Sequence, residues 1–527
     1  MSSIKIEMNI EKKKFISILI LSIISFSVNF HYASYGVLPI DTFAFFDTGF
    51  RIIHGETPFN DYWTISGPFI DLLQSIYFFI FGVNWTTYIL NGSITNLAIT
   101  LALFYFLCDS GLDYKYSFFY STCFAFLANP SMGTPFPDHY SSFLSLISII
   151  SFLFAVKYQK KIYWFLIPVF LFLAFFSKQT PAAFIILLLL CNFFLHYITR
   201  KDLEFFIPLT LGALFSILLL IIFLFFFKID LTAFITQYFL YPQSIGSNRI
   251  NDLHLTFNKA VSTLKFLHFV LITVILIFLK NFLTKKNYFK EHNFLINFNI
   301  ISYTILLIFH QWITLNFTFI FFLIPILCAL IQINLKFSTN KKFLISFLLC
   351  FCLLVTTKYH LRFNQERKML DLENINLSNF YESERFSVKL KGLNWKTREF
   401  SLNTPEEIRK LNFIKKLLES EKKRIMFLSN YQFFSVVLKK SLNSPNRWYG
   451  GLVAHPPESN PYYEKYLMFN YNLIVKKKIE VIYIDLNLGS YQKKLFNKLF
   501  KRLPLGCVNS YNLKDYLIKY DISSCFN

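Results

Sequence analysis

The stretch EFFIPLTLGALFSILLLIIFLFFF, residues 204–227, contains one charged residue, Glu204. A helix needs about 20 consecutive apolar residues to cross the hydrocarbon core of a bilayer. This stretch is therefore predicted to be a transmembrane helix, and it is the pattern for which the rest of the chain is searched.

Ten further apolar runs come close to this length, with about 17 residues as the lower limit for a span. The run at 15–33 could instead be a signal peptide, but no small-residue cleavage site precedes Asp41, so it is interpreted as a retained span. The third, fifth and eleventh runs are the shortest. The eleven predicted spans are 15–33, 86–107, 115–129, 139–156, 162–177, 181–198, 204–227, 259–280, 293–311, 313–334 and 342–358.

The composition agrees with a membrane protein. Of 527 residues, 54% are hydrophobic and only 16% are charged, whereas ordinary globular domains carry about 25% charged residues. The net charge of +22 would also suit a nucleic-acid-binding protein. No basic stripe with a nucleic-acid-binding motif is present, however, and lysines between membrane spans account for the excess better.

The loops between the runs differ in charge, which predicts an orientation. One alternate set is rich in lysine, whereas the other holds little beyond Arg51, Lys178, Lys228 and Arg249. Because positively charged loops stay in the cytoplasm, the N-terminus is predicted to lie inside. Eleven crossings then place the 40–85 loop and the tail outside. The lysine-rich set comprises Lys12, Lys13, Lys14, Lys115, Lys157, Lys160, Lys161, Arg200, Lys201, Lys280, Lys285, Lys286, Lys290, Lys336, Lys341 and Lys342.

The tail from residue 359 onward is polar and mixed in charge. RIMFLSN at 424–430 and VIYIDLN at 481–487 are predicted to be short buried strands, each followed by helix-like sequence. Thr404 is the predicted N-cap of one helix, with Pro405 at its first position. The tail has no glycine-rich phosphate loop, so no nucleotide site is predicted.

The predicted fold is thus a membrane-embedded all-α bundle of about 11 transmembrane helices over residues 1–358, whose first outer loop is 34–85. Residues 359–527 are predicted to form a small extracytoplasmic α/β domain. Cys507 and Cys525 could form a disulfide if this domain lies outside the cytoplasm. The protein is expected in the cytoplasmic membrane as a multi-pass chain.

The first outer loop contains IDTFAFFDTGFRIIHGETPFNDYWTISGPFIDLL, residues 40–73, which is dense in acidic and aromatic residues. Apolar side chains at 43–53 recur at helical spacing, and Gly55 can end the helix. A second helix is expected over 68–82. Both are predicted to lie along the membrane surface, with their polar groups at the lipid–water boundary.

Several segments carry a resemblance when taken in order. Asp41 is followed by RIIHGETPFNDYW and GPF, then by PFPDHYSSFLSL at 135–146 and SKQTPAAF at 177–184. This set resembles the GT-C superfamily of membrane glycosyltransferases. Within it, the chain is similar to bacterial family 39-like transferases, relatives of the protein O-mannosyltransferases and the lipid A aminoarabinose transferase. Asp41 is followed by Thr42, where many relatives have a second acid, so the resemblance leaves any divalent-metal requirement open.

The resemblance implies transfer of a sugar from a polyprenyl-phosphate donor to an acceptor on the outer face of the membrane. The attacking hydroxyl must lose its proton, so a positioned carboxylate is expected as the base. The departing phosphate is stabilised by Lys or Arg in a partly dry site. No cofactor is certain, and the sugar and the acceptor (a glycan, a lipid or a protein) are left open.

Each candidate residue also has an ordinary structural interpretation. Asp41 and Asp138 are the expected catalytic acids, although either could cap a helix. Asp47 and Arg51 could bind substrate or form a surface ion pair, since they are four apart on a helix. Lys178 could contact phosphate or extend to the bilayer surface. Further substrate-binding candidates are Asp61, His139 and Arg249, with His54 and Glu56 also considered as solvated loop residues.

Two other functions were weighed against an enzyme. A transporter or flippase of lipid-linked glycans should carry charged residues deep within several spans or show two repeated halves, and the sequence shows neither. A non-catalytic membrane scaffold would explain the tail but gives the 40–73 segment no purpose.

Overall fold

The chain forms two compact units, each assembled from three segments. The first comprises Met1–Ser34, Ile89–Ile221 and Asp252–Asn374, and the second comprises Tyr35–Tyr88, Ile222–Asn251 and Ile375–Asn527. The second unit therefore joins the predicted first outer loop to the tail. The computed structural model describes residues 2–129, 133–201, 203–251, 253, 256–257, 261–314, 320–335, 341–375, 379–449, 453–488, 490–504 and 506–526.

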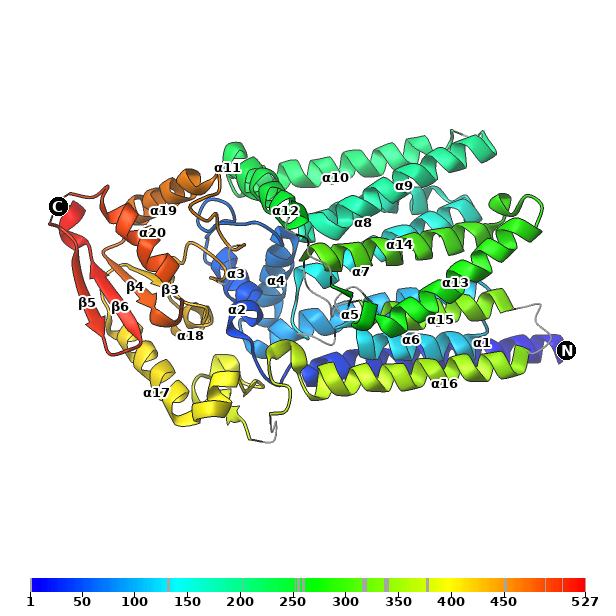
Figure 1. Cartoon of the computed structure of the whole chain (residues 1–527), viewed down its shortest axis with the longest axis horizontal. Coiled ribbons are helices and arrows are strands. Elements are labelled where there is room, and N and C mark those ends of the chain that lie inside the picture. Colours follow the sequence, from blue (N-terminus) through cyan, green and yellow to red (C-terminus); the bar gives the residue numbers. More distant parts are fainter. Residues whose placement is uncertain are drawn as a thin grey trace. The chain divides into compact units, whose positions relative to one another are not determined.

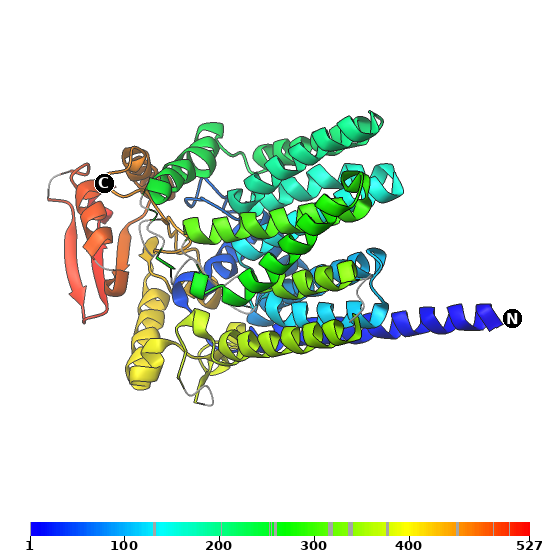
Figure 2. The ribbon, with the colours of Figure 1, turned by 45° about the vertical axis from the view of Figure 1, so that its right-hand side comes forward.

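The first unit is a bundle of long helices that lie side by side (Figures 1 and 2). In the described part of the chain, eight helical segments are long and apolar enough to cross a membrane. They are Glu11–Tyr32 in α1 (Ser2–Tyr32), α5 (Trp85–Asp109), α7 (Pro137–Tyr158), α9 (Gln179–Arg200), α10 (Phe206–Phe226), α13 (Lys265–Thr284), α14 (His292–Thr314) and Lys341–Leu370, which starts with α16 (Lys341–His360).

The other three predicted spans coincide with shorter helices. These are α6 (Tyr114–Ala128), α8 (Lys161–Ser177) and α15 (Leu323–Asn334). A multi-pass membrane protein is thus supported, whereas the count of eleven spans stays a prediction. Residues 259–260 and 315–319 of the predicted spans, and Lys336, lie outside the described residues.

Small and amide-bearing residues hold these helices together. Asn192 of α9 and Asn299 of α14 donate to each other's side-chain oxygens at 2.8 and 3.2 Å. Such amide pairs satisfy polar groups that have no water to bind within a bilayer. Gly212 of α10 packs against α8 so closely that a Cβ there would lie 2.2 Å from the carbonyl oxygen of Phe165. A side chain at residue 212 would force these two helices apart.

The second unit begins with α2 (Pro39–Thr42), α3 (Ala44–Ile53) and α4 (Pro68–Phe81). The helix predicted over 43–53 is α3, and the prediction that it lies along the membrane surface is wrong, because every residue from Ala44 to Arg51 is buried. Phe43 and Phe46 pack against Trp85, and Phe43 also packs against Phe433 of the tail. The helix is covered by residues distant in sequence, so its apolar face could not be assigned from its own spacing.

Helix α4 keeps the character expected of an interfacial helix. It begins at Pro68 and ends before Gly82, whose φ of 83° favours glycine. Phe79 is 83% exposed and Ile80 is 61% exposed, while Asp71 and Gln74 are fully buried. Its apolar face is therefore outward and its polar face inward, the reverse of a helix in water, as suits contact with lipid.

The tail contains the predicted α/β domain. Its four-stranded sheet has the order β3-β4-β6-β5, with β3 and β4 parallel and the other pairs antiparallel. The strands are β3 (Ile425–Leu428), β4 (Val481–Asp485), β5 (Asn509–Leu513) and β6 (Leu517–Asp521). Both predicted strands are thus confirmed. Every residue of β3 and β4 is buried, which explains their unbroken apolar runs, whereas the polar β5 is an exposed edge.

Helices cover both faces of this sheet. The side chains of β3 and β4 alternate between faces, and Met426 and Ile482 join a core with α19 (Tyr463–Lys477) and α20 (Ser490–Phe500). Tyr483 points to the other face, where its hydroxyl donates to Glu421 at 2.7 Å, just beyond the end of α17.

Helix α17 (Arg398–Ser420) consists of two helical pieces that meet at a kink. Its N-cap is Thr397, whose hydroxyl accepts from the Phe400 N–H at 2.9 Å. The chain kinks at Asn403, which has non-helical φ and ψ, and the Thr404 hydroxyl donates to the Phe400 carbonyl instead of capping. The second helical piece therefore begins beside Pro405, close to the predicted start, and the proline stands in its first turn, where it is tolerated.

Cys507 and Cys525 form a disulfide that joins the two ends of the β5–β6 hairpin. Six other cysteines are free thiols. Structural disulfides persist in oxidising compartments and are rare in the cytoplasm. The pairing therefore favours the predicted extracytoplasmic position of the tail.

A thiol-labelling measurement checks this position. Alkylation of the denatured protein from intact cells should leave Cys507 and Cys525 unlabelled, and prior reduction should expose both. In Cys507→Ser, Cys525 should label without a reductant, which controls for access of the reagent. Labelling of both residues in the unreduced parent would place the tail in a reducing compartment.

Candidate functional site

One cluster of ionisable side chains lies at an end of the helix bundle in the first unit. The Lys178 ammonium lies 2.7 Å from both carboxylate oxygens of Asp138. The Nε2 of His310 lies 2.8 Å from Oδ1 of the same carboxylate. The side chains of Asp138 and His310 are 4% and 1% exposed, whereas that of Lys178 is 23% exposed. Lys178 is therefore the member of the cluster with the most accessible side chain.

Local sequence places each group. Pro137 occupies the first turn of α7, where its missing N–H costs nothing, and Asp138 follows it. Lys178 is the extended residue between α8 and α9, with φ of −160° and ψ of 135°. The Ser141 hydroxyl donates to the Lys178 carbonyl at 3.1 Å and ties this turn to α7. His310 lies near the end of α14, which brings the third group to the same end of the bundle.

The arrangement assigns different tasks to the three residues. Asp138 accepts hydrogen bonds from two neighbours and is nearly inaccessible, so it is suited to hold Lys178 in place rather than to meet a substrate. A partly exposed ammonium at a helix end is suited to bind a phosphate oxyanion, because charge-assisted contacts strengthen where water is scarce. His310 was missed by the sequence reasoning; its only local signal was a histidine near the end of a predicted span.

The ring of His139, the residue after Asp138, packs against aromatic side chains. His139 is 2% exposed, and its ring packs at 6.0 Å from Phe136 and at 5.8 Å from Phe143. Its surroundings are therefore largely aromatic, although it follows Asp138 in the sequence. The substrate-binding role suggested for it stays a prediction.

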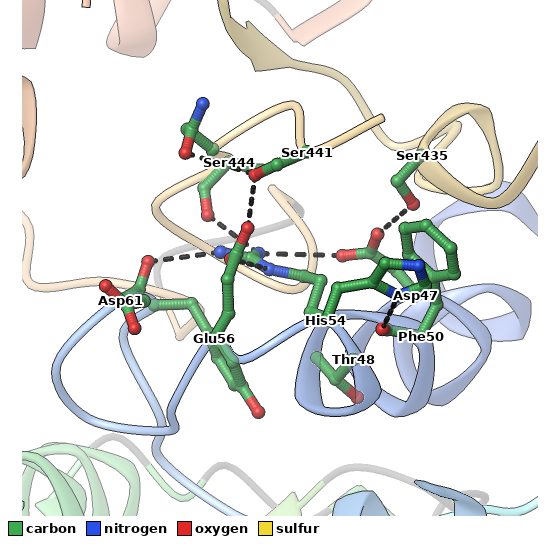
Figure 3. Close-up of polar contacts among 12 residues, drawn as sticks. Asp47, Thr48, Phe50, His54, Glu56, Asp61, Ser435, Ser441 and Ser444 are labelled. Carbon is green, nitrogen blue, oxygen red and sulfur yellow. Dashed lines mark hydrogen bonds and ion pairs between the residues drawn. The ribbon is translucent and has the colours of Figure 1, made fainter. Parts of the chain in front are cut away.

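A second cluster lies in the second unit, where acidic side chains of the first loop meet serine side chains of the tail (Figure 3). At its centre is Arg51 of α3. Its Nε donates to Glu56 at 2.6 Å, and an Nη lies 3.5 Å from Asp47. The remaining Nη contacts are the carbonyl oxygens of Ser444 at 2.8 Å and Asp61 at 3.1 Å. Arg51 thereby connects the first loop to the tail.

Asp47 and Arg51 are thus not a surface ion pair, because their side chains are only 2% and 4% exposed. Serine hydroxyls of the tail complete the cluster. Ser435 donates to Asp47, and Ser441 donates to Glu56. These partners are nearly 400 positions away in the sequence, so no local pattern could reveal them.

Loss of Arg51 should destabilise the protein strongly. Arg51→Met would leave two buried carboxylates without their cation, and breaking a buried pair in this way costs about 3–5 kcal/mol. Thermal unfolding in detergent should show a large fall in midpoint. Arg385→Met is the matched control, because Arg385 pairs with Glu382 on the surface and exposed pairs contribute about 0–1 kcal/mol. Equal stability of both variants would contradict a structural role for Arg51.

Burial raises the pKa of Asp47 from 3.8 to about 6, and nearby Arg51 only partly offsets this. A raised pKa means that the folded state favours the protonated acid. The contribution of protonated Asp47 to the free energy of unfolding is complete below about pH 4. It is lost as the pH rises through about 6, and the free energy of unfolding then falls by about 3 kcal/mol. The difference in unfolding midpoint between the parent and Asp47→Asn should therefore change across pH 4–6. If the difference in midpoint between the two proteins stays constant from pH 4 to pH 6, the pKa of Asp47 is not raised.

A third buried pair also links the loop to the tail. Arg447 forms an ion pair with Asp71, and its guanidinium lies over the rings of Phe45 and Tyr62 at 5.4 and 5.5 Å. Arg51 lies over Tyr62 as well, at 4.5 Å. Both Arg51 and Arg447 thus have carboxylate partners within the protein. The charged residues of the 40–73 segment therefore serve mainly to hold the second unit together.

The other candidates of the second unit are dispersed. Asp41 is half-buried in the first turn of α2, whose N-cap is Leu38, so Asp41 is not the cap. Asp61 accepts from the Thr57 N–H at 2.8 Å and pairs with Lys476 and Lys477 at 3.1 Å each. Burial would raise the pKa of Asp61, but the Thr57 hydrogen bond and the two lysines lower it overall.

Arg249 is partly exposed in α12 (Tyr241–Asn251). His54 is exposed at the end of α3, and its Nδ1 lies 2.8 Å from the Phe50 carbonyl oxygen.

Among the described residues, no group of three or more His, Cys, Asp or Glu side chains could hold a metal ion. No protein-family model matches the chain, and no curated protein matches it.

Proposed function

We propose that this chain is a glycosyltransferase that moves a sugar from a polyprenyl-phosphate donor to an acceptor on the outer face of the cytoplasmic membrane. The observation that carries the proposal is the Asp138–Lys178–His310 cluster at one end of an apolar helix bundle. The bundle suits a long apolar carrier, and the reachable cation suits its phosphate.

In this proposal, the bond between the anomeric carbon and the carrier phosphate oxygen breaks, and an acceptor oxygen forms the new bond to that carbon. Lys178 binds the departing phosphate and stabilises the negative charge that it gains. Asp138 and His310 are positioning residues that keep the ammonium in place. A carboxylate base must take the acceptor proton, and the resemblance assigns this role to Asp41.

Orientation supports the same reaction. The opposite ends of these helices carry the lysines that the positive-inside rule assigns to the cytoplasm, among them Lys157, Lys161 and Lys341. The end with Asp138 is then external. A transporter would be expected to place charged groups deep within spans, whereas Asp138 lies in the first turn of α7 and His310 within the last turns of α14.

Comparison of surface glycans tests the function. Deletion of the gene should remove one hexose- or pentose-sized mass increment from a glycolipid, polysaccharide or glycoprotein. The parent gene should restore the increment, and a Lys178→Ala gene that yields the same amount of protein should not. An unchanged glycan profile in cells that normally express the protein would refute the proposal.

A further inference from the structure

Two lysines converge on one aromatic ring at the junction of α13 and α16. The ammonium groups of Lys265 and Lys358 lie 5.5 and 4.7 Å from the centroid of Phe266. Lys265 is the first residue of α13, and Lys358 lies in the last turn of α16. Neither helix carries a residue of the Asp138–Lys178–His310 cluster, so this junction is a separate feature of the bundle.

The local charge is strongly positive. Among the described residues, the charges that act on the Lys358 ammonium are Lys265 and Arg362, both cations. Arg362 forms an ion pair with Glu373 at 3.7 Å, and Glu373 also pairs with Lys368. The Arg362 side chain is 41% exposed, and the single carboxylate of Glu373 offsets only part of the positive charge of these side chains.

The helix ends do not explain this arrangement. A lysine in the last turn of α16 is favoured by the helix dipole, but a lysine at the first position of α13 is opposed by it. The N-cap of α13, Leu264, provides no side-chain acceptor for the first N–H groups. An anion would offset the charge of both lysines and would suit the positive end of the α13 dipole.

Apolar side chains continue from the cations along both helices. Phe266 and Phe269 contact Phe351 of α16 at 6.1 and 5.3 Å between ring centroids. Phe269 is 50% exposed and Leu354 is 70% exposed. A phosphate bound between the lysines would therefore have an apolar surface beside it for a hydrocarbon chain.

The junction lies at the same bundle end as the Asp138 cluster. Phe266, at the start of α13, packs 6.3 Å from Tyr359 at the end of α16. The neighbouring His360 bonds to Tyr32 at the end of α1, and Asn29 of α1 bonds to Gly133, shortly before α7. The proposed orientation therefore makes this basic junction external, where the positive-inside rule does not account for it.

We propose that Lys265, Lys358 and Arg362 form a second lipid site, which binds polyprenyl monophosphate, the spent carrier of the proposed reaction. This inference rests on the proposed function. A phosphate monoester carries about −1.5 to −2 charges at pH 7, whereas the phosphodiester of a bilayer phospholipid carries one. Three cations thus match the monoester better. The site would take up the carrier after it has lost its sugar.

Lipid binding to the full-length protein tests this site. The protein is reconstituted in neutral phosphatidylcholine nanodiscs, and native mass spectrometry follows titration with polyprenyl monophosphate or phosphatidylglycerol. The parent should bind the monophosphate at least tenfold more tightly than phosphatidylglycerol. Because Lys178 is proposed to bind the same phosphate, the parent should bind two monophosphates. Lys265→Ala/Lys358→Ala should lose at least tenfold in affinity at one of the two sites, and the Arg/Arg double variant should retain most of it, which controls for folding. Lys341→Ala/Lys342→Ala removes the same charge from the other end of α16 and should bind like the parent.

Equal binding by the parent and Lys265→Ala/Lys358→Ala would overturn the site. Equal or tighter binding of phosphatidylglycerol would overturn the identity of its occupant. Sugar transfer is measured separately on the same samples. Selective binding that depends on the lysines, in a parent that transfers no sugar from any donor, would refute the proposed function without refuting the lipid site.

Discussion

Asp41→Asn should lose about 100- to 10,000-fold of sugar transfer, because the amide cannot accept the acceptor's proton and general-base catalysis contributes about that much. The variant should fold and insert normally. Leu38, not Asp41, is the N-cap of α2, so the substitution removes no capping hydrogen bond. The measurement is the rate of donor consumption in membranes that contain matched amounts of each protein.

Asp113→Asn is the matched control for this prediction. Asp113 is an exposed residue that caps α6 by accepting from the Lys115 N–H, and Asn caps helices about as well as Asp. Its transfer rate should equal that of the parent. An Asp41→Asn rate within about threefold of the parent would fall well below the general-base range and would remove Asp41 from the proposed mechanism.

Lys178→Ala should reduce transfer by about 100- to 1,000-fold, the range seen when one preorganised charge-stabilising group is removed from a reacting centre. Lys178→Arg should keep part of the activity, because charge remains while its geometry changes. Asp138→Asn should cost less than Lys178→Ala, since it leaves the ammonium present but loosens its position. Donor concentration is varied in each assay so that kcat and KM are separated.

Lys228→Ala controls for the general loss of an external lysine, since Lys228 is exposed and directly follows the predicted span at 204–227. Its rate should match that of the parent. Lys178→Ala also leaves Asp138 without its cation, so the unfolding midpoint of each variant is measured. A folded Lys178→Ala protein with the parent's rate at every donor concentration would show that Lys178 does not bind the carrier phosphate.

The sequence predicted those elements whose signal lies in neighbouring residues, and it failed where distant residues decide the structure. Unbroken apolar runs located the long helices, and those at 424–430 and 481–487 located β3 and β4, because strands buried on both faces need no polar alternation. The surface position of α3 was wrong, since the residues that bury it come from the tail. Length alone also left the crossing of α6, α8 and α15 unsettled.

The sequence likewise identified some residues of the candidate site and missed others. Asp138 and Lys178 were selected separately as polar residues at predicted span ends, and the structure brings them together. Their partner His310 was missed, because it is 172 positions from Asp138 and helix packing alone unites them. Asp47 and Arg51 were correctly paired by their four-residue spacing, but the same spacing could not show that both are buried.

The most direct test of the central claim uses purified protein in vesicles with a polyprenyl-phosphate sugar labelled in the sugar. Membranes from the deletion strain supply the unmodified acceptor. The account predicts that label leaves the carrier and enters a larger glycolipid, glycan or protein with the parent protein, but not with Lys178→Ala. If the label stays on the carrier for every donor sugar and acceptor fraction, while the same membranes accept sugar from an extract of the parent strain, this chain is not the transferase.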